Sequence, residues 1–269
     1  MSQPDTMPIE ATDRLLEQTW DELERVGYAV VPEVLTADEL ATVRDALEPH
    51  LRDGPSGRSD FEGVATRRVY GLVAKSRAFD RLVLDPIALG VAEREYGPST
   101  LLTATLAIDL APGQPAQALH FDDAFYPLAR PRRPVSISTL WTIDEFTAAN
   151  GATIMCPGTH TWGEVDLSRA QFDERATFVA AEAPPGSLLI YSGTLVHGGG
   201  ANTSDGHRLA VSIQYAAAWA RQQENFMMEL GVDGARELPE RVQELIGYNI
   251  HSLFMGMVDG RHPKKLLSR

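Results

Sequence analysis

The sequence predicts a mainly β fold with flanking helices, and two observations support this fold class. From about residue 101 onward, the chain is a series of short apolar runs bounded by Gly, Pro or Asn, a spacing typical of a β-sandwich or barrel. Within residues 135–143, apolar and mostly polar positions alternate with the period of a strand. We therefore expect one domain over residues 1–269, with a helical part at about 1–100, a β core at about 101–218, and a helical or irregular C-terminal part.

The N-terminal part has the patterns of two helices separated by a short strand. Residues 10–26 have the apolar spacing of an amphipathic helix that ends before Gly27. Residues 27–35 indicate a short strand, and a capping box follows it. Thr36 can cap the next helix while Glu39 reaches back to the backbone of Thr36. We therefore expect the second helix to begin directly after Thr36.

Three further segments complete the expected outline. Residues 52–66 are rich in Gly, Ser and Asp and predict a loop. Functional loops of such length are often mobile covers, so we expect this one to be a lid. A helical pattern returns at about 76–96, and another begins the C-terminal part at 220–230.

The composition limits the class of partner. Asp and Glu number 37 against 24 Lys and Arg, and the formal net charge is −13. Binding to nucleic acid or to an anionic membrane needs a basic surface, so we expect neither and predict a small-molecule partner.

Cys156 is the only cysteine, which excludes an intrachain disulfide. The sequence has no apparent signal peptide and no apolar run of membrane-spanning length, so we expect a cytoplasmic protein.

The stretch QALHFDDAFYP, residues 117–127, contains the first candidate metal ligands. If it is a strand, His120 and Asp122 project from the same face. The best third ligand is His197, which follows an apolar strand and precedes three glycines. Two histidines and a carboxylate form the facial triad of non-haem Fe(II) oxygenases, although zinc and manganese accept the same ligands. The pattern thus predicts a metal site with open positions.

Arg208 is the residue that favours iron with an organic co-substrate. It opens a predicted strand in which Arg208, Ser212 and Gln214 share one face, opposite the apolar positions 209, 211, 213 and 215. A guanidinium on the polar face of a core strand requires an anionic partner, and its planar fork matches a carboxylate. A dicarboxylic acid that chelates iron at one end would place its far carboxylate at this residue.

These motifs resemble those of the phytanoyl-CoA dioxygenase (PhyH)-like family of Fe(II)/2-oxoglutarate oxygenases. The matching pieces are the H-x-D of His120 and Asp122, the segments 141–153 and 157–160, and His197 followed by Arg208. The resemblance runs through about 100–220 and more weakly into both ends. It implies a double-stranded β-helix, the jelly roll of cupin-like proteins.

The resemblance also implies a set of ligands. Fe(II) is held by His120, Asp122 and His197, and Arg208 holds 2-oxoglutarate, with O2 as the other reactant. Four further residues match positions near 2-oxoglutarate: Gln117, Trp141, Thr153 and Arg68. A strand through 117–122 would turn Gln117 away from His120. Related halogenases lack the carboxylate, so Asp122 favours hydroxylation or another oxidation, with conversion of 2-oxoglutarate to succinate and CO2.

The expected substrate is a small or medium organic molecule, and the acidic chain disfavours an acyl-CoA. Candidate pocket residues are Phe125, Tyr126 and Asp123, the last also with an expected structural role. Two other functions remain open. A cupin-like isomerase, epimerase or hydrolase would use zinc or manganese with Arg208 as a structural residue, and a non-catalytic small-molecule binding protein would need no chemistry.

Overall fold

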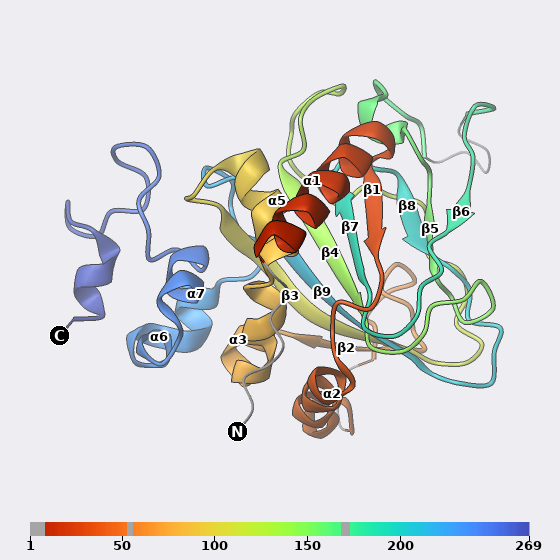
Figure 1. Ribbon diagram of the computed structural model, residues 1–269, viewed down its shortest axis with the longest axis horizontal. Helices are drawn as coiled ribbons and strands as arrows, with labels where there is room; N and C mark the ends of the chain where they lie inside the picture. The colour runs from red at the N-terminus through yellow and green to blue at the C-terminus, as the bar shows by residue number, and fades with distance from the viewer. Residues whose placement is uncertain (1–8, 53–55, 168–172, 269) are drawn as a thin grey trace.

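Two antiparallel sheets form the centre of the protein in a computed structural model that describes residues 9–52, 56–167 and 173–268 (Figure 1). The larger sheet has the strand order β1-β7-β4-β9-β3-β2, and the smaller has the order β6-β5-β8. The strands are β1 (Tyr28–Val31), β2 (Thr66–Tyr70), β3 (Leu101–Leu110), β4 (Ser136–Thr142), β5 (Thr153–Met155), β6 (Val179–Ala180), β7 (Leu188–Ser192), β8 (His197–Gly199) and β9 (Arg208–Ala216).

Helices cover one face of the larger sheet (Figure 1). The α-helices are α1 (Ile9–Val26), α2 (Ala37–Arg52), α3 (Leu72–Lys75), α4 (Asp80–Val83), α5 (Pro86–Tyr96), α6 (Phe226–Arg236) and α7 (Glu240–Leu245). Short 3-10 helices lie at Arg77–Phe79, Thr159–Thr161 and Pro263–Leu266. None of the helices in the described ranges is both long enough and apolar enough to cross a membrane.

The two faces of β9 have different surroundings, as its alternating sequence predicts. Leu209, Val211, Ile213 and Tyr215 are buried in the core that the sheet shares with α2, α4, α5, α6 and α7. The other face lines a cavity between the sheets. The predicted mainly β fold with flanking helices and a jelly-roll arrangement is therefore confirmed, with two separate sheets in the described part of the chain and no closed barrel.

Two helical predictions need correction. The pattern at 76–96 forms three short helices, because Ser76 is extended and its hydroxyl caps the 3-10 helix while Asp85 caps α5. The predicted helix at 220–230 begins only at Phe226. The residues before it are bonded to β3 instead, with the Glu224 amide donating to the Thr103 carbonyl at 2.9 Å.

The capping box predicted at the start of α2 is present. The Thr36 amide donates to the Glu39 carboxylate at 2.8 Å, and the Glu39 amide donates to the Thr36 hydroxyl at 3.3 Å. We expect Thr36→Ala to lower the free energy of unfolding by about 1 kcal/mol, because an orphan amide of the first turn loses its acceptor. Urea denaturation measures this loss. Thr42→Ala within the same helix is the control, and an equal loss in that variant would contradict a capping effect.

Candidate metal centre and co-substrate pocket

His120, Asp122 and His197 come together where the two sheets meet. His197 opens β8, and His120 pairs with it in an isolated bridge whose two backbone hydrogen bonds both measure 2.8 Å. The prediction of a strand through 117–122 is wrong, because the chain turns directly after His120 and the Ala124 amide donates to the Phe121 carbonyl. The turn still brings Asp122 back toward both histidines.

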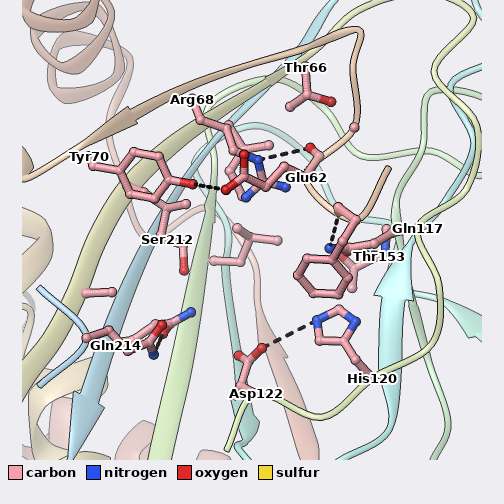
Figure 2. A pocket seen from close by; sticks show the side chains of 18 of the residues that line it. Glu62, Thr66, Arg68, Tyr70, Gln117, His120, Asp122, Thr153, Ser212 and Gln214 are labelled. Atoms are coloured by element: carbon pink, nitrogen blue, oxygen red, sulfur yellow. Dashed lines mark hydrogen bonds and ion pairs between the residues drawn. The ribbon is translucent and has the colours of Figure 1, made fainter. Parts of the chain in front are cut away.

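The ligand atoms of these three residues all lie within 4.8 Å of one another. One oxygen of Asp122, Oδ1, is 3.5 Å from His120 Nε2 and 3.4 Å from His197 Nε2, and Figure 2 shows His120 and Asp122 pointing toward each other. Each histidine places Nδ1 3.0 Å from a backbone carbonyl, that of Ala118 or Leu195. A carbonyl can only accept, so Nδ1 carries the proton and Nε2 presents a lone pair, as metal-binding histidines do.

The charges at the centre also suit a cation. Burial alone would raise the pKa of Asp122, but the imidazoles of His197 and His120 outweigh burial and hold this pKa well below its usual range. Burial opposes protonation of His197, yet the Asp122 carboxylate raises the pKa of His197 above its usual value. This donor set of two imidazoles and one carboxylate fits a divalent metal such as Fe(II).

We expect metal affinity to fall as the pH falls through the raised pKa of His197. Below that pKa a metal ion must displace a proton from the imidazole, whereas Asp122 stays ionised throughout. Each further pH unit should weaken Co(II) binding by about tenfold for this single proton. Titration calorimetry between pH 5 and pH 8 measures the affinity, and an affinity independent of pH would contradict a histidine ligand.

Arg208 is buried and has no carboxylate partner in the described part of the chain. Only 3% of the residue is exposed. One Nη donates to the Gly151 carbonyl at 2.9 Å, and the guanidinium lies 4.3 Å from the centre of the Phe146 ring. Nε has no hydrogen-bond partner among the residues that the structure describes. Burial lowers the pKa of Arg208 to about 10. A buried guanidinium with an unused N–H group lowers the stability of the folded protein unless a bound ligand accepts a hydrogen bond from it.

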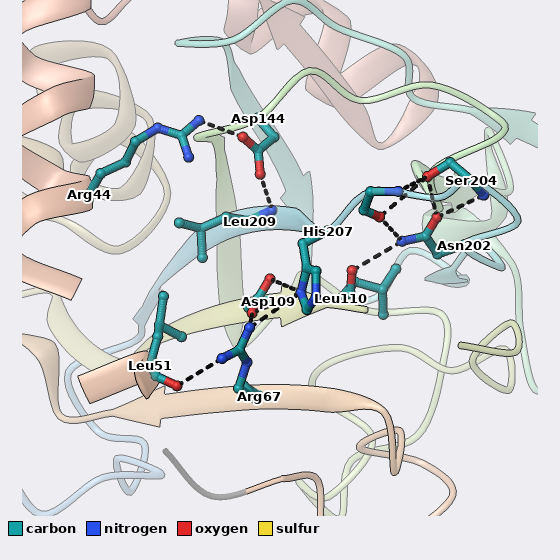
Figure 3. Close-up of polar contacts among 11 residues, drawn as sticks. Arg44, Leu51, Arg67, Asp109, Leu110, Asp144, Asn202, Ser204, His207 and Leu209 are labelled. Atoms are coloured by element: carbon teal, nitrogen blue, oxygen red, sulfur yellow. Dashed lines mark hydrogen bonds and ion pairs between the residues drawn. The ribbon is translucent and has the colours of Figure 1, made fainter. Parts of the chain in front are cut away.

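The two carboxylates nearest to Arg208 in its electrostatic surroundings, Asp144 and Asp109, have other partners, which Figure 3 shows. Asp144 accepts from the Leu209 amide at 2.7 Å and pairs with Arg44 at 2.5 Å. On the other side, Asp109 pairs with Arg67 at 2.7 Å and with His207 at 3.0 Å. Both nearby carboxylates are therefore already paired with other cations. The backbone on each side of Arg208 is fixed, so its side chain is held inward.

One cavity of about 1330 Å³ connects the metal ligands with Arg208. Most of the residues predicted around 2-oxoglutarate and substrate line it: Gln117, Thr153, Arg68 and Phe125. Gln117 was expected to face away from His120, but the segment before His120 is not a strand, so alternation does not apply. Its amide accepts from the Gly199 backbone at 3.1 Å and donates to the Phe61 carbonyl at 3.0 Å.

Trp141 does not line this cavity. Its side chain is fully buried in the core between the larger sheet and the helices, whereas the preceding residue, Leu140, faces the cavity. Successive residues of β4 point to opposite faces, so Trp141 is on the wrong side of the sheet to contact 2-oxoglutarate. The prediction that it contributes to the pocket is therefore corrected.

Asp123 and Tyr126 also lie outside the cavity. Asp123 is fully buried, forms an ion pair with Arg132 at 2.8 Å and accepts from the Val135 amide at 2.9 Å. It is a structural residue of the turn, which is the second role expected for it. The Tyr126 hydroxyl donates to the Arg221 carbonyl at 3.0 Å, so its polar end is used in packing the C-terminal segment.

The predicted loop at 52–66 contributes residues that the sequence did not single out. Residues 53–55 lie outside the described residues, but Arg58, Phe61 and Glu62 line the cavity. Phe61 meets the His120 ring edge-on, with ring centres 4.8 Å apart. No spacing pattern points to this contact, because it joins a loop to a residue far along the chain. The segment therefore contacts the metal centre through Phe61, and its role as a lid stays a prediction.

Comparisons of the sequence with known proteins indicate one family. The family model "Phytanoyl-CoA dioxygenase (PhyH)" matches residues 23–210. Dioxygenase ALT11 of Alternaria alternata is 29% identical over 255 residues, which cover 88% of this chain and 83% of that protein. Dioxygenase FUM3 of Gibberella moniliformis is 28% identical over 252 residues, covering 87% and 82%.

Solved structures share the fold at lower identity. The non-heme alpha ketoglutarate dependent epimerase SnoN from nogalamycin biosynthesis aligns with a TM-score of 0.65 at 21% identity, over 77% of this chain and 82% of that one. The carbocyclase SnoK from the same biosynthesis aligns with a TM-score of 0.63 at 21% identity, over 77% and 86%.

The family match, together with the cluster of His120, Asp122 and His197, places the chain in the class of the iron- and 2-oxoglutarate-dependent oxygenases. Within this class, the chain belongs to the phytanoyl-CoA dioxygenase family, whose model matches more than half of it. The predicted cofactors, iron and 2-oxoglutarate, are those of this family, and the His120, Asp122 and His197 cluster provides the expected ligand set.

Proposed function

We propose that this protein oxidises a C–H bond of a small or medium organic substrate, most simply by hydroxylation, while 2-oxoglutarate is converted to succinate and CO2. His120, Asp122 and His197 hold Fe(II), and Arg208 binds the far carboxylate of 2-oxoglutarate. The observation that carries this proposal is the buried guanidinium of Arg208, which lies in the same cavity as the metal ligands and has no carboxylate partner among the described residues. In a metal-dependent isomerase or hydrolase without an acidic co-substrate, Arg208 would be a structural residue held by Gly151 and Phe146.

The protein's own residues bind and orient the reactants. Iron with 2-oxoglutarate and O2 supplies the oxidising chemistry. Arg208 fixes the co-substrate at its far end, because a guanidinium fork accepts a carboxylate in one plane. Arg68 and Thr153 line the same region, and Arg68 lies close enough to Arg208 to lower its pKa. Phe61 packs edge-on against the His120 ring and helps to orient this imidazole.

The remaining part of the cavity suits a neutral substrate. Gln223 donates to Gln214 at 2.8 Å, and this amide pair leaves hydrogen-bonding groups open to the cavity. Apolar surface comes from Phe125 and Met228, both of which line it. The cavity exceeds the roughly 300–1,000 Å³ of ordinary ligand pockets, so a substrate fits beside 2-oxoglutarate.

A coenzyme A ester fits this cavity poorly. Of the three arginines that line it, Arg58 is paired with Glu62 at 2.5 Å, and Arg68 and Arg208 belong to the co-substrate end. The phosphates of coenzyme A would therefore find no unpaired arginine in the outer part of the described cavity. A neutral natural product or a fatty molecule without coenzyme A is the substrate class that we propose.

Epimerisation is the second candidate outcome. It is favoured by the shared fold with SnoN, which is named as an alpha ketoglutarate dependent epimerase. The same metal centre would serve both reactions, since each begins by breaking a C–H bond. The mass of the product distinguishes them, because hydroxylation adds one oxygen atom whereas epimerisation leaves the mass unchanged.

The test is an anaerobic titration of the metal-free protein with Fe(II) and then with 2-oxoglutarate, followed by visible absorption. Chelation of Fe(II) by a 2-oxo acid gives a weak charge-transfer band, and admission of O2 should then produce succinate. A band together with succinate supports the proposal. Metal binding without a band would favour the isomerase or hydrolase alternative, and ligand binding without any metal dependence would favour the non-catalytic binding protein.

A further inference from the structure

Ser138 contacts Asp122 Oδ2, the carboxylate oxygen that is not the one paired with His120 and His197. It lies in the middle of β4, is fully buried, and donates its hydroxyl proton to Asp122 Oδ2. The other carboxylate oxygen, Oδ1, faces His120 and His197. The two oxygens of Asp122 thus have separate partners, a serine hydroxyl on one side and the metal position on the other.

This serine is held on a rigid element, whereas the carboxylate that it contacts is not. Ser138 pairs with Tyr191 of β7 on one side and with Gln214 of β9 on the other, so its backbone is fixed from both neighbouring strands. Asp122 lies in a turn after a single bridge. A side chain in a turn needs an external anchor to keep one orientation, and a hydroxyl on a central strand provides it.

The same row of the sheet also supports the second histidine. The Tyr191 ring packs against the His197 imidazole with ring centres 4.7 Å apart. Tyr191 and Ser138 are direct neighbours across the sheet and both have buried side chains. The orientations of a carboxylate ligand and an imidazole ligand are therefore set by two adjacent residues that would not themselves touch the metal.

We propose that Ser138 is a positioning residue that restricts Asp122 to binding iron through one oxygen only. An octahedral metal with three protein ligands has just enough open positions for both oxygens of a 2-oxo acid and for O2. If Asp122 bound through both oxygens, it would occupy a position that the co-substrate or O2 needs. Ser138 thereby keeps the site open for its reactants. This inference rests on the proposed function, since it assumes that the cluster binds a metal and 2-oxoglutarate.

The test uses Co(II) and 2-oxoglutarate as probes under anaerobic conditions, with the full chain and no substrate. We expect Ser138→Ala to weaken Co(II) binding by about 10- to 100-fold, the usual effect of removing a group that orients a metal ligand. Binding of 2-oxoglutarate to the Co(II) form should also weaken. The visible Co(II) spectrum should also change, because a second oxygen of Asp122 would replace another ligand of the ion. Ser138→Thr retains the hydroxyl and should restore all three properties.

The matched control is Ser136→Ala, which removes a buried hydroxyl from the same face of β4. The Ser136 hydroxyl has no hydrogen-bond partner within the described ranges, so this variant should behave like the wild type. Unchanged Co(II) affinity and spectrum in Ser138→Ala would overturn the proposal. An equal loss of affinity in both alanine variants, without a spectral change, would also overturn it, because the effect would then be one of packing. If the wild type itself binds no metal, the proposed function fails as well.

Discussion

Replacing Arg208 with alanine should abolish 2-oxoglutarate binding at ordinary concentrations and leave metal binding intact. Arg208 is the buried cation without a carboxylate partner in the described cavity lining, and a carboxylate would complete it. Removing one member of a buried charge pair costs about 2–5 kcal/mol, which corresponds to a loss of affinity of roughly 30- to several thousand-fold. The Fe(II) charge-transfer band should therefore require much more 2-oxoglutarate to appear, or should not appear at all.

Two comparisons make this experiment specific. Arg67→Ala removes a cation of the same strand as Arg68, but Arg67 pairs with Asp109 outside the cavity, so 2-oxoglutarate should bind this variant normally. Arg208→Lys retains the charge without the planar fork, and we expect only partial recovery. If Arg208→Ala binds Fe(II) and 2-oxoglutarate as tightly as the wild type, Arg208 is a structural residue and the co-substrate assignment is wrong.

The direction of Arg208 could be predicted from the sequence because β9 is a regular strand. Alternation along 208–216 separates the cavity face from the core face, and the ladders to β3 and β4 preserve that period. The same rule would have placed Trp141 correctly. Trp141 alternates with Leu140 on β4, so only one of them can face the cavity. Its assignment to the pocket came from the resemblance to the family, and the local pattern decided otherwise.

The segment around His120 could not be predicted in the same way. From the sequence we interpret this segment as a strand and infer from it that His120 and Asp122 share a face, but the bridge to His197 is a single pair and the chain turns after it. The ligands converge through tertiary contacts, among them the hydrogen bond from Ser138, sixteen residues along the chain from Asp122. Such contacts leave no period in the sequence, which is why Ser138, Tyr191 and Phe61 were not identified.

Replacing His197 with alanine should weaken metal binding more than replacing Ser138, which only orients a ligand. His197 is a buried ligand candidate. Its Nδ1 donates a hydrogen bond to the Leu195 carbonyl, and its Nε2 lies 3.4 Å from Asp122 Oδ1. Loss of a group that only orients a ligand weakens metal binding by about 10- to 100-fold, so loss of the ligand itself should exceed that range. Calorimetric titration with Co(II) measures the affinity, and O2-dependent succinate formation should disappear.

The control for this variant is His207→Ala, because His207 pairs with Asp109 away from the metal centre. It should bind Co(II) like the wild type.

The effect of His197→Ala on small-molecule binding also separates an enzyme from a binding protein on the same scaffold. In a non-catalytic protein, His197→Ala would leave small-molecule binding nearly unchanged, since no ligand contact would depend on a metal. In the proposed enzyme, 2-oxoglutarate binding must fall together with metal binding, because the co-substrate is held by the iron at one end and by Arg208 at the other.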